Sequence, residues 1–429
     1  MDIKIYENEK IKEKLFFKEL DSGLKVYFMP KEGYTKQYAI FSTNYGSIDN
    51  IFTPIREDET IEVPEGIAHF LEHKLFEEPE ENIFDKFSKL GANVNAYTNF
   101  TQTAYLFSST ENFYENLELL VQFVQHPYFT DENVEKEKGI IAQEINMYKD
   151  NPNWRVFFNC LRAMYTEHPV RIDIAGTVES IQDINKELLY KCYDTFYNPN
   201  NMVLFIAGDL SFDEILKIVE KTERKDYTKI EEVNRVFKEE PKGVKESFIE
   251  ENMMTSTPLF YIGFKDEDVN LPGEERVKKD LVTNFILDMI FGSSSVFYNE
   301  LYEEGIIDSS FGAYFTGKKS YGHSLVGGES KKPKEVYNRV MDLFEKDPQS
   351  ILIEDDFNRI KRKNIGGFLM AFNSVESIAN NFMDLYFEEV LLIDYLEILE
   401  SIEYKDLIER FNKHFVKENV VLSIVNPLS

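Results

Sequence analysis

The chain carries two histidines and a glutamate within five residues, His69-Phe70-Leu71-Glu72-His73. In a helix, His69 and His73 lie one turn apart on the same face, so two imidazoles can hold one zinc ion. Glu72 projects over that face, where its carboxylate could accept a proton from a water molecule at the metal. The pentapeptide inverts the commoner His-Glu-x-x-His order, and both orders are signatures of zinc hydrolases. Because so short a match also arises by chance, the surrounding residues must support the assignment.

A third metal ligand is expected elsewhere in the chain, because zinc hydrolases usually have three protein ligands and leave the fourth position to water. Residues 132–148 have helical periodicity, and one stripe of that helix holds Glu137, Ile140, Ile141, Glu144 and Tyr148. The two isoleucines predict that the stripe points inward, where a carboxylate is costly unless it is paired or binds a metal. Glu137 or Glu144 is therefore a candidate ligand. The alternative is a solvated face, because the same segment also holds Glu132, Glu135, Lys136 and Lys138.

Composition excludes several classes of function. The 429 residues include 48 basic and 77 acidic side chains, for a formal net charge of −29. Such a charge opposes binding to nucleic acid and to anionic membrane surfaces. It favours cationic substrates such as basic peptides, although excess surface glutamate often serves only solubility. The N-terminal segment lacks an apolar signal core and no segment approaches the length of a membrane span, which predicts a cytoplasmic protein.

The elements that position these residues follow from the sequence pattern. Strands are expected over 24–30 and 38–47, and Pro64-Glu65-Gly66 precedes a helix that contains the pentapeptide. A helix over 84–90 ends at Gly91, residues 93–109 alternate as strand, and helices follow over 112–125 and 132–148. The cysteines, Cys160 and Cys192, lie in apolar stretches and are expected to be buried free thiols.

The second half of the chain repeats this order. The pattern predicts a strand over 260–264, helices over 276–291 and 297–304, strands within 311–327, and helices over 334–345 and 355–371. The glycine after the second helix is Gly91 in one half and Gly305 in the other, an offset of 214 (305 − 91). Because the chain exceeds what one core supports, we expect an α+β protein of two homologous domains, each a mostly antiparallel sheet with helices packed on it.

The predicted boundaries are a catalytic zinc-binding domain over 1–227, a charged linker over 228–247 and a second domain over 248–429. The same offset matches the metal face of the first half to Thr283, Ile286 and Leu287. These side chains do not bind zinc, so the second domain is expected to have no metal site.

Two segments, Gly66–His73 and Glu137–Ile145, resemble the pitrilysin family of inverted zinc metallopeptidases, which includes insulin-degrading enzyme and the mitochondrial processing peptidase. In that family the third ligand is the second glutamate of a Glu-x6-Glu pair, and here Glu144 lies 71 residues after His73 (144 − 73). The resemblance implies one zinc ion per chain, held by His69, His73 and Glu144. It also implies Glu72 as general base and Glu137 as the carboxylate that orients a ligand histidine.

Further landmarks extend the resemblance across most of the chain, at 168–177 and 197–202. Residues 91–98 resemble the family's edge strand, whose backbone pairs with the substrate, and this implies substrate contacts at Asn95, Ala96 and Tyr97. The implied activity is a zinc endopeptidase that cuts short or unfolded peptides. The competing interpretations are a weak or inactive subunit kept for assembly or processing, and a zinc hydrolase of non-peptide amides.

The chain departs from the family in its second half. Members commonly carry an Arg and, shortly after it, a Tyr, which approach the substrate from the far side of a closed chamber. The matching residues here are Tyr302 and Asp308. Because short members pair two chains to build the chamber, we expect a heterodimer with a paralogous subunit that supplies the Arg/Tyr pair. A homodimer is the alternative.

Overall fold

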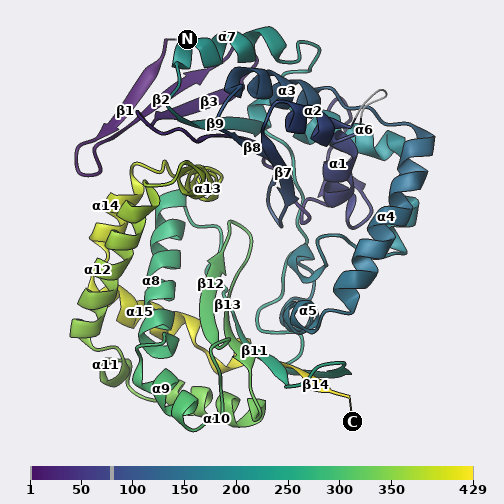
Figure 1. Cartoon of the computed structure of the whole chain (residues 1–429). Coiled ribbons are helices and arrows are strands. Elements are labelled where there is room, and N and C mark those ends of the chain that lie inside the picture. The colour runs from purple at the N-terminus through teal and green to yellow at the C-terminus, as the bar shows by residue number, and fades with distance from the viewer. Residues whose placement is uncertain (1, 78–81, 429) are drawn as a thin grey trace. The chain divides into compact units, whose positions relative to one another are not determined.

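The computed structural model describes residues 2–77 and 82–428, so the outermost ends of the two predicted domains, Met1 and Ser429, lie outside it. The chain divides into two compact units. Unit 1 comprises Met1–Ile145, Asp173–Phe237 and Ala371–Phe387. Unit 2 comprises Asn146–Ile172, Lys238–Met370 and Glu388–Ser429. Each unit has its own sheet with helices packed on it (Figure 1), which confirms the predicted α+β class with two domains.

The sheet of unit 1 has seven strands in the order β1-β2-β3-β9-β4-β8-β7. Their bounds are β1 Lys4–Asn8, β2 Glu13–Glu19, β3 Lys25–Pro30, β4 Gln37–Thr43, β7 Asn93–Thr98, β8 Thr103–Ser109 and β9 Met202–Gly208. All neighbours are antiparallel except β3 and β9, which are parallel. A separate short pair is formed by β5 (Ile51–Phe52) and β6 (Ile61–Glu62). β7 lies at the sheet edge and, among the described strands, pairs with β8 alone.

The sheet of unit 2 repeats this topology. Its order is β10-β14-β11-β13-β12, and β10 and β14 are its parallel pair. It therefore matches β3-β9-β4-β8-β7 in order and in direction, as the repeat in the sequence predicts. The bounds are β10 Phe248–Met253, β11 Leu259–Lys265, β12 Gly312–Gly317, β13 Gly322–Glu329 and β14 Val420–Pro427.

The predicted helices are present within a few residues of their expected ends. In the first half they are α1 Ile67–Leu75, α2 Ile83–Lys89, α3 Phe113–Gln125 and α4 Asp131–Lys149. In the second half they are α8 Gly273–Phe291, α9 Val296–Glu303, α10 Pro333–Phe344 and α12 Glu354–Ala371. Gly91 and Gly305 have φ values of 76° and 67°, a left-handed conformation that ends a helix and favours glycine at both matched positions.

The remaining α-helices have no counterpart among the sequence predictions. They are α5 Pro152–Met164, α6 Lys186–Phe196, α7 Phe212–Thr222, α11 Pro348–Ile351, α13 Val375–Tyr386, α14 Tyr395–Ser401 and α15 Tyr404–His414. Among the described residues no single helix is long and apolar enough to cross a membrane. The bent pair α8 and α9 meets that criterion only when the two are taken together, by length and composition.

The compact units do not follow the contiguous boundaries expected from the sequence. α5 lies in the first half of the chain and packs on the strands of unit 2, whereas α13 lies in the second half and packs on β4 and β9 of unit 1. On β9, Phe205 stacks on Phe382 of α13 with ring centroids 4.3 Å apart. Part of the expected linker also belongs to unit 1, where Arg235 donates to the buried Asp49 carboxylate at 2.9 Å.

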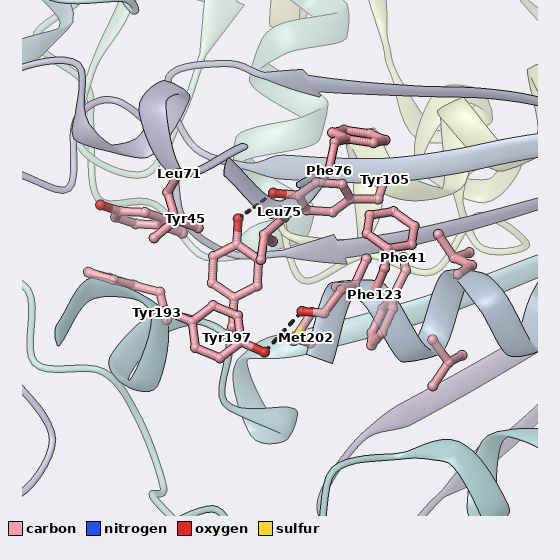
Figure 2. Packing of buried hydrophobic residues seen from close by; sticks show 14 of the residues in the cluster. Phe41, Tyr45, Leu71, Leu75, Phe76, Tyr105, Phe123, Tyr193, Tyr197 and Met202 are labelled. Atoms are coloured by element: carbon pink, nitrogen blue, oxygen red, sulfur yellow. Dashed lines mark hydrogen bonds between the residues drawn. The ribbon is translucent and has the colours of Figure 1, made fainter. Parts of the chain in front are cut away.

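The core of unit 1 fixes α1 (Figure 2). By helical spacing, Leu71 and Leu75 lie on the side of α1 opposite the two histidines. Both belong to the apolar cluster, which includes Phe41, Tyr45, Phe76, Tyr105, Phe123, Tyr193, Tyr197 and Met202. The hydroxyls of Tyr105 and Tyr197 are 2.8 Å apart, so these buried phenols satisfy each other. Burial of this apolar side leaves the histidine side of α1 outside the core. Cys160 and Cys192 are buried free thiols, as predicted.

Candidate metal centre

His69, His73 and Glu144 come together from two helices of unit 1. On α1 the rings of His69 and His73 have centroids 4.6 Å apart. Glu144 of α4 places Oε1 3.8 Å from His69 Nε2 and Oε2 3.5 Å from His73 Nε2. One ligand atom from each residue lies within 4.8 Å of the other two, and no other such group of three is found among the described residues.

The donor set fits zinc. Two imidazole nitrogens and one carboxylate oxygen make three protein ligands, and donors around one tetrahedral zinc ion lie roughly 3 to 4 Å apart, given bonds of about 2 Å. His69 is 12% exposed, and burial, with a smaller contribution from His73, lowers its pKa to about 3. Its ring is therefore neutral, which is the form that binds a metal. The buried Nδ1 of His69 has no hydrogen-bond partner among the described residues.

Glu137 contacts the other nitrogen of His73. Its Oε1 lies 3.1 Å from His73 Nδ1, so a proton on Nδ1 leaves the Nε2 lone pair directed toward Glu144. Burial alone would lower the pKa of His73, but the hydrogen bond that His73 donates to Glu137 and the nearby Glu72, Glu137 and Glu144 carboxylates outweigh burial and raise the pKa. The sequence did not decide which of the two glutamates is the ligand. In the structure Glu144 faces the Nε2 atoms of both histidines, whereas Glu137 faces Nδ1 of His73.

Glu72 is held by a strand residue. Its side chain is buried, and Thr98 of β7 donates to Glu72 Oε2 at 2.7 Å. Burial raises the pKa of Glu72, while the Thr98 hydrogen bond and His73 partly oppose the rise. A carboxylate with a raised pKa suits a group that must both accept and release a proton. The sequence pattern predicts a strand at Thr98 but no role for it, although period-two alternation puts Thr98 on the same face as Val94 and Ala96.

One expectation about α4 is wrong. Ile140 was predicted to point inward but is 46% exposed, whereas Ile141 is fully buried. The buried side of α4 is formed by Val134, Glu137, Lys138, Ile141 and Ile145. The centre of the apolar side is therefore rotated away from Ile140, which leaves Glu144 at its border with a side chain that is 23% exposed. A position at the border, neither in the core nor fully in water, suits a metal ligand.

Asn95, Ala96 and Tyr97 lie on the edge strand β7, against which α1 packs. The Ala96 N–H donates to Asn95 Oδ1 at 2.9 Å, and Tyr97 OH accepts from Gln102 at 2.9 Å. β7 presents one unpaired side among the described strands, so a peptide could add to it as a further strand. The substrate contacts expected at these residues stay a prediction.

The matched face of unit 2 is ordinary core. Thr283, Ile286 and Leu287 of α8 are buried, and the Thr283 hydroxyl donates to the Lys279 carbonyl at 2.7 Å. The described residues of unit 2 contain no metal-binding group of the kind found in unit 1.

The two positions where the chain departs from the family pattern are also in unit 2. Tyr302 is half-exposed and stacks on Tyr298, with centroids 5.8 Å apart. Asp308 Oδ1 accepts from the Ser310 N–H at 2.8 Å. Neither side chain is cationic, so neither can replace the missing Arg.

The chain is similar to known peptidases in sequence and in fold. The family described as insulinase (peptidase family M16) matches residues 59–178, and the peptidase M16 inactive domain matches 183–364. The chain is 44% identical over 428 residues to the uncharacterized zinc protease YmfH of Bacillus subtilis, covering 100% of both. It is 32% identical over 162 residues to the mitochondrial-processing peptidase subunit beta of Caenorhabditis elegans, covering 36% of this chain and 35% of that one. The crystal structure of an M16-like peptidase from Alicyclobacillus acidocaldarius superimposes with a TM-score of 0.92 at 37% identity, covering 100% and 99% of the two chains.

Proposed function

Because the chain belongs to the M16 (insulinase) family of peptidases, we propose that it is a zinc-dependent endopeptidase that cuts short or unfolded peptides. The observation that carries the proposal is the convergence of His69, His73 and Glu144 within 4.8 Å, beside the buried carboxylate of Glu72. A subunit kept only for assembly would not need these four side chains together.

The residues of the centre have separable roles. Bound zinc would supply Lewis acidity toward the scissile carbonyl and the attacking water. His69 and His73 would hold the ion through Nε2 and Glu144 through its carboxylate, while Glu137 fixes the ring of His73. Glu72 accepts the proton of the attacking water and delivers it to the leaving amine. The hydrogen bond from Thr98 holds that carboxylate in place during both transfers.

The edge strand β7 is the proposed binding surface for the peptide. A substrate added as a strand beside Asn95, Ala96 and Tyr97 would be held mainly by its main chain, so varied side chains could be accepted. Only an extended segment can pair in this way, which restricts cleavage to short or unfolded chains. The net charge of −29 is the reason to include basic peptides among the test substrates.

We expect the zinc-loaded chain to cut an unfolded, internally quenched peptide whose two ends are blocked, since blocked ends leave only internal bonds. Mass spectrometry of the fragments identifies the bond, and a folded protein of similar length serves as the control that should stay intact. Cleavage should stop on chelation and return when one equivalent of zinc is restored. A chain that holds one zinc ion and releases no fragments, alone or with a partner subunit, would favour the assembly role.

The second proposal concerns a partner. Tyr302 and Asp308 supply no cation toward a substrate carbonyl, so we propose a paralogous subunit that retains the Arg/Tyr pair. A well-placed donor to a developing oxyanion contributes about 10²–10³-fold in rate, and addition of the partner should raise kcat by about that factor. The matched control is the partner with its Arg replaced by Met. If the isolated chain is as active as the mixture with the partner and forms a dimer in light scattering, a homodimer is supported instead. A cytoplasmic location stays a prediction.

A further inference from the structure

Lys74, the residue after the second histidine, is completely buried, with an exposed fraction of 0%. Lysine is almost never fully buried unless its charge is paired. Its ammonium group donates to the Glu77 carboxylate and to the main-chain oxygen of Asn133 at 3.2 Å. It also lies 3.8 Å from Glu137 Oε2. Lys74 therefore connects the end of α1 with the carboxylate on α4 that contacts His73.

Glu137 lies between the two side chains and uses a different oxygen for each. Oε1 is 3.1 Å from His73 Nδ1, and Oε2 is 3.8 Å from Lys74 Nζ. The Glu137 side chain is only 6% exposed, so water contributes little to its position. With one oxygen directed to the imidazole and the other to the ammonium group, rotation of the carboxylate would weaken both contacts at once.

The negative charges around the centre can explain why a lysine is buried at position 74. Glu72, Glu137 and Glu144 place three carboxylates around two imidazoles, and one of these carboxylates, Glu137, is buried beside Lys74. A buried ion pair contributes little to stability, because desolvation of both charges offsets their attraction. Such a pair can instead fix the relative positions of its two groups. A lysine needed only to anchor Glu77 would not have to be buried, because the Glu77 side chain is itself 27% exposed.

We propose that Lys74 is a positioning residue of the metal centre, which holds Glu137 so that Glu137 orients His73. This inference rests on the proposed function, since the orientation of His73 matters only if His73 binds the metal. Partners that orient a ligand histidine contribute about 10–100-fold to metal affinity. Lys74 acts through one further contact, so its removal should weaken zinc binding by about 10-fold, the lower end of that range.

The test is a double-mutant cycle on the zinc affinity of the full chain, measured by competition with a chromophoric chelator. Lys74→Met should weaken zinc binding by about 10-fold in the wild-type background. In a Glu137→Gln background the same change should have an effect of no more than about 2-fold, because the contact through which Lys74 acts is already lost. Purely structural damage from the lost lysine would instead weaken binding equally in both backgrounds.

The matched control is Lys138→Met. Lys138 is also a buried lysine, which donates to Glu135 at 2.5 Å and to the Gln182 carbonyl at 2.9 Å. Neither of these partners is a proposed ligand or Glu137. This variant should lose thermal stability but keep the zinc affinity of the wild type.

Three results would decide against the inference: unchanged affinity in Lys74→Met, an equal loss in both backgrounds, or an equal loss in Lys138→Met. If Lys74→Met does not fold, Lys74→Gln takes its place in the cycle, because glutamine lacks the charge and offers a shorter, neutral N–H donor toward the Asn133 carbonyl. A wild-type chain that binds no zinc would instead refute the proposed function, so the two failures are distinguishable.

Discussion

The Glu72→Gln variant is expected to lose peptide cleavage by about 10²–10⁴-fold in kcat, the contribution typical of a general base. Glutamine has the shape of glutamate but cannot accept the proton of the attacking water. Thr98 can still donate to the amide oxygen, so the buried side chain keeps its hydrogen bond and the fold should be retained. Because Glu72 is not a proposed ligand, zinc content should equal that of the wild type.

Three measurements on the same preparation separate catalysis from folding: kcat with the quenched peptide, zinc by elemental analysis and Tm by calorimetry. The matched control is Glu135→Gln on α4, where the side chain is 68% exposed and pairs with Lys138. The control should match the wild type in kcat and in zinc content, and a small loss of Tm is expected because the change weakens the ion pair with Lys138. A Glu72→Gln protein with wild-type kcat would show that another group serves as the base, and the peptidase mechanism proposed for this centre would be wrong.

The part of the centre that could be predicted from the sequence is the part that lies within single helices. His69 and His73 are one turn apart on any helix, so their convergence needs no knowledge of the tertiary fold. The same periodicity placed Glu137 and Glu144 together on one face of α4. It could not say which carboxylate faces the Nε2 atoms, because that depends on how α4 is rotated against α1.

Residues that act across elements were missed for the same reason. Thr98 reaches Glu72 from a strand, and Lys74 reaches Glu137 from another helix. A lone lysine beside an apolar run is usually solvated, so its sequence carried no sign of burial. Thr98 was within reach of prediction, since alternation along β7 puts it on the face of Ala96, although nothing local names its partner.

The fold shows the same division between local and distant information. Gly91 and Gly305 made the repeat predictable. Each ends a helix in a left-handed conformation, and this requirement for glycine depends only on the local backbone. The exchange of α5 and α13 between the units was not predictable, because an apolar helix face does not specify the sheet that it covers. The parallel pairing of β9 with β3 and of β14 with β10 was not predicted either, because the two strands of each pair lie far apart in the sequence.

Replacing Glu144 by glutamine is expected to have the largest effect on metal binding. The amide is a poorer zinc ligand than the carboxylate, and loss of a ligand should exceed the roughly 10–100-fold effect of losing a partner that only orients one. We therefore expect zinc affinity to fall by more than about 100-fold. Peptide cleavage at limiting zinc should fall to the level of the metal-free protein.

Thermal unfolding with and without zinc provides an independent measure of the same loss. Zinc at about 1,000 times the dissociation constant stabilises a protein by about 4 kcal/mol, and 100-fold weaker binding leaves about 1.4 kcal/mol. The increase in Tm on adding zinc should therefore shrink to about a third in Glu144→Gln. The metal-free proteins should unfold at similar temperatures, because Glu144 lies at the border of the core and contributes little to it.

Two variants on the same helix complete the experiment. Glu137→Gln, which removes the partner of His73 Nδ1, should weaken zinc binding by about 10–100-fold. Glu135→Gln should leave zinc binding unchanged. The expected order of effects, Glu144 above Glu137 above Glu135, follows from the contacts of Glu144 with both Nε2 atoms at 3.8 and 3.5 Å. If Glu137→Gln lost more affinity than Glu144→Gln, the ligand and the orienting residue would be exchanged, and the centre built from His69, His73 and Glu144 would be wrong.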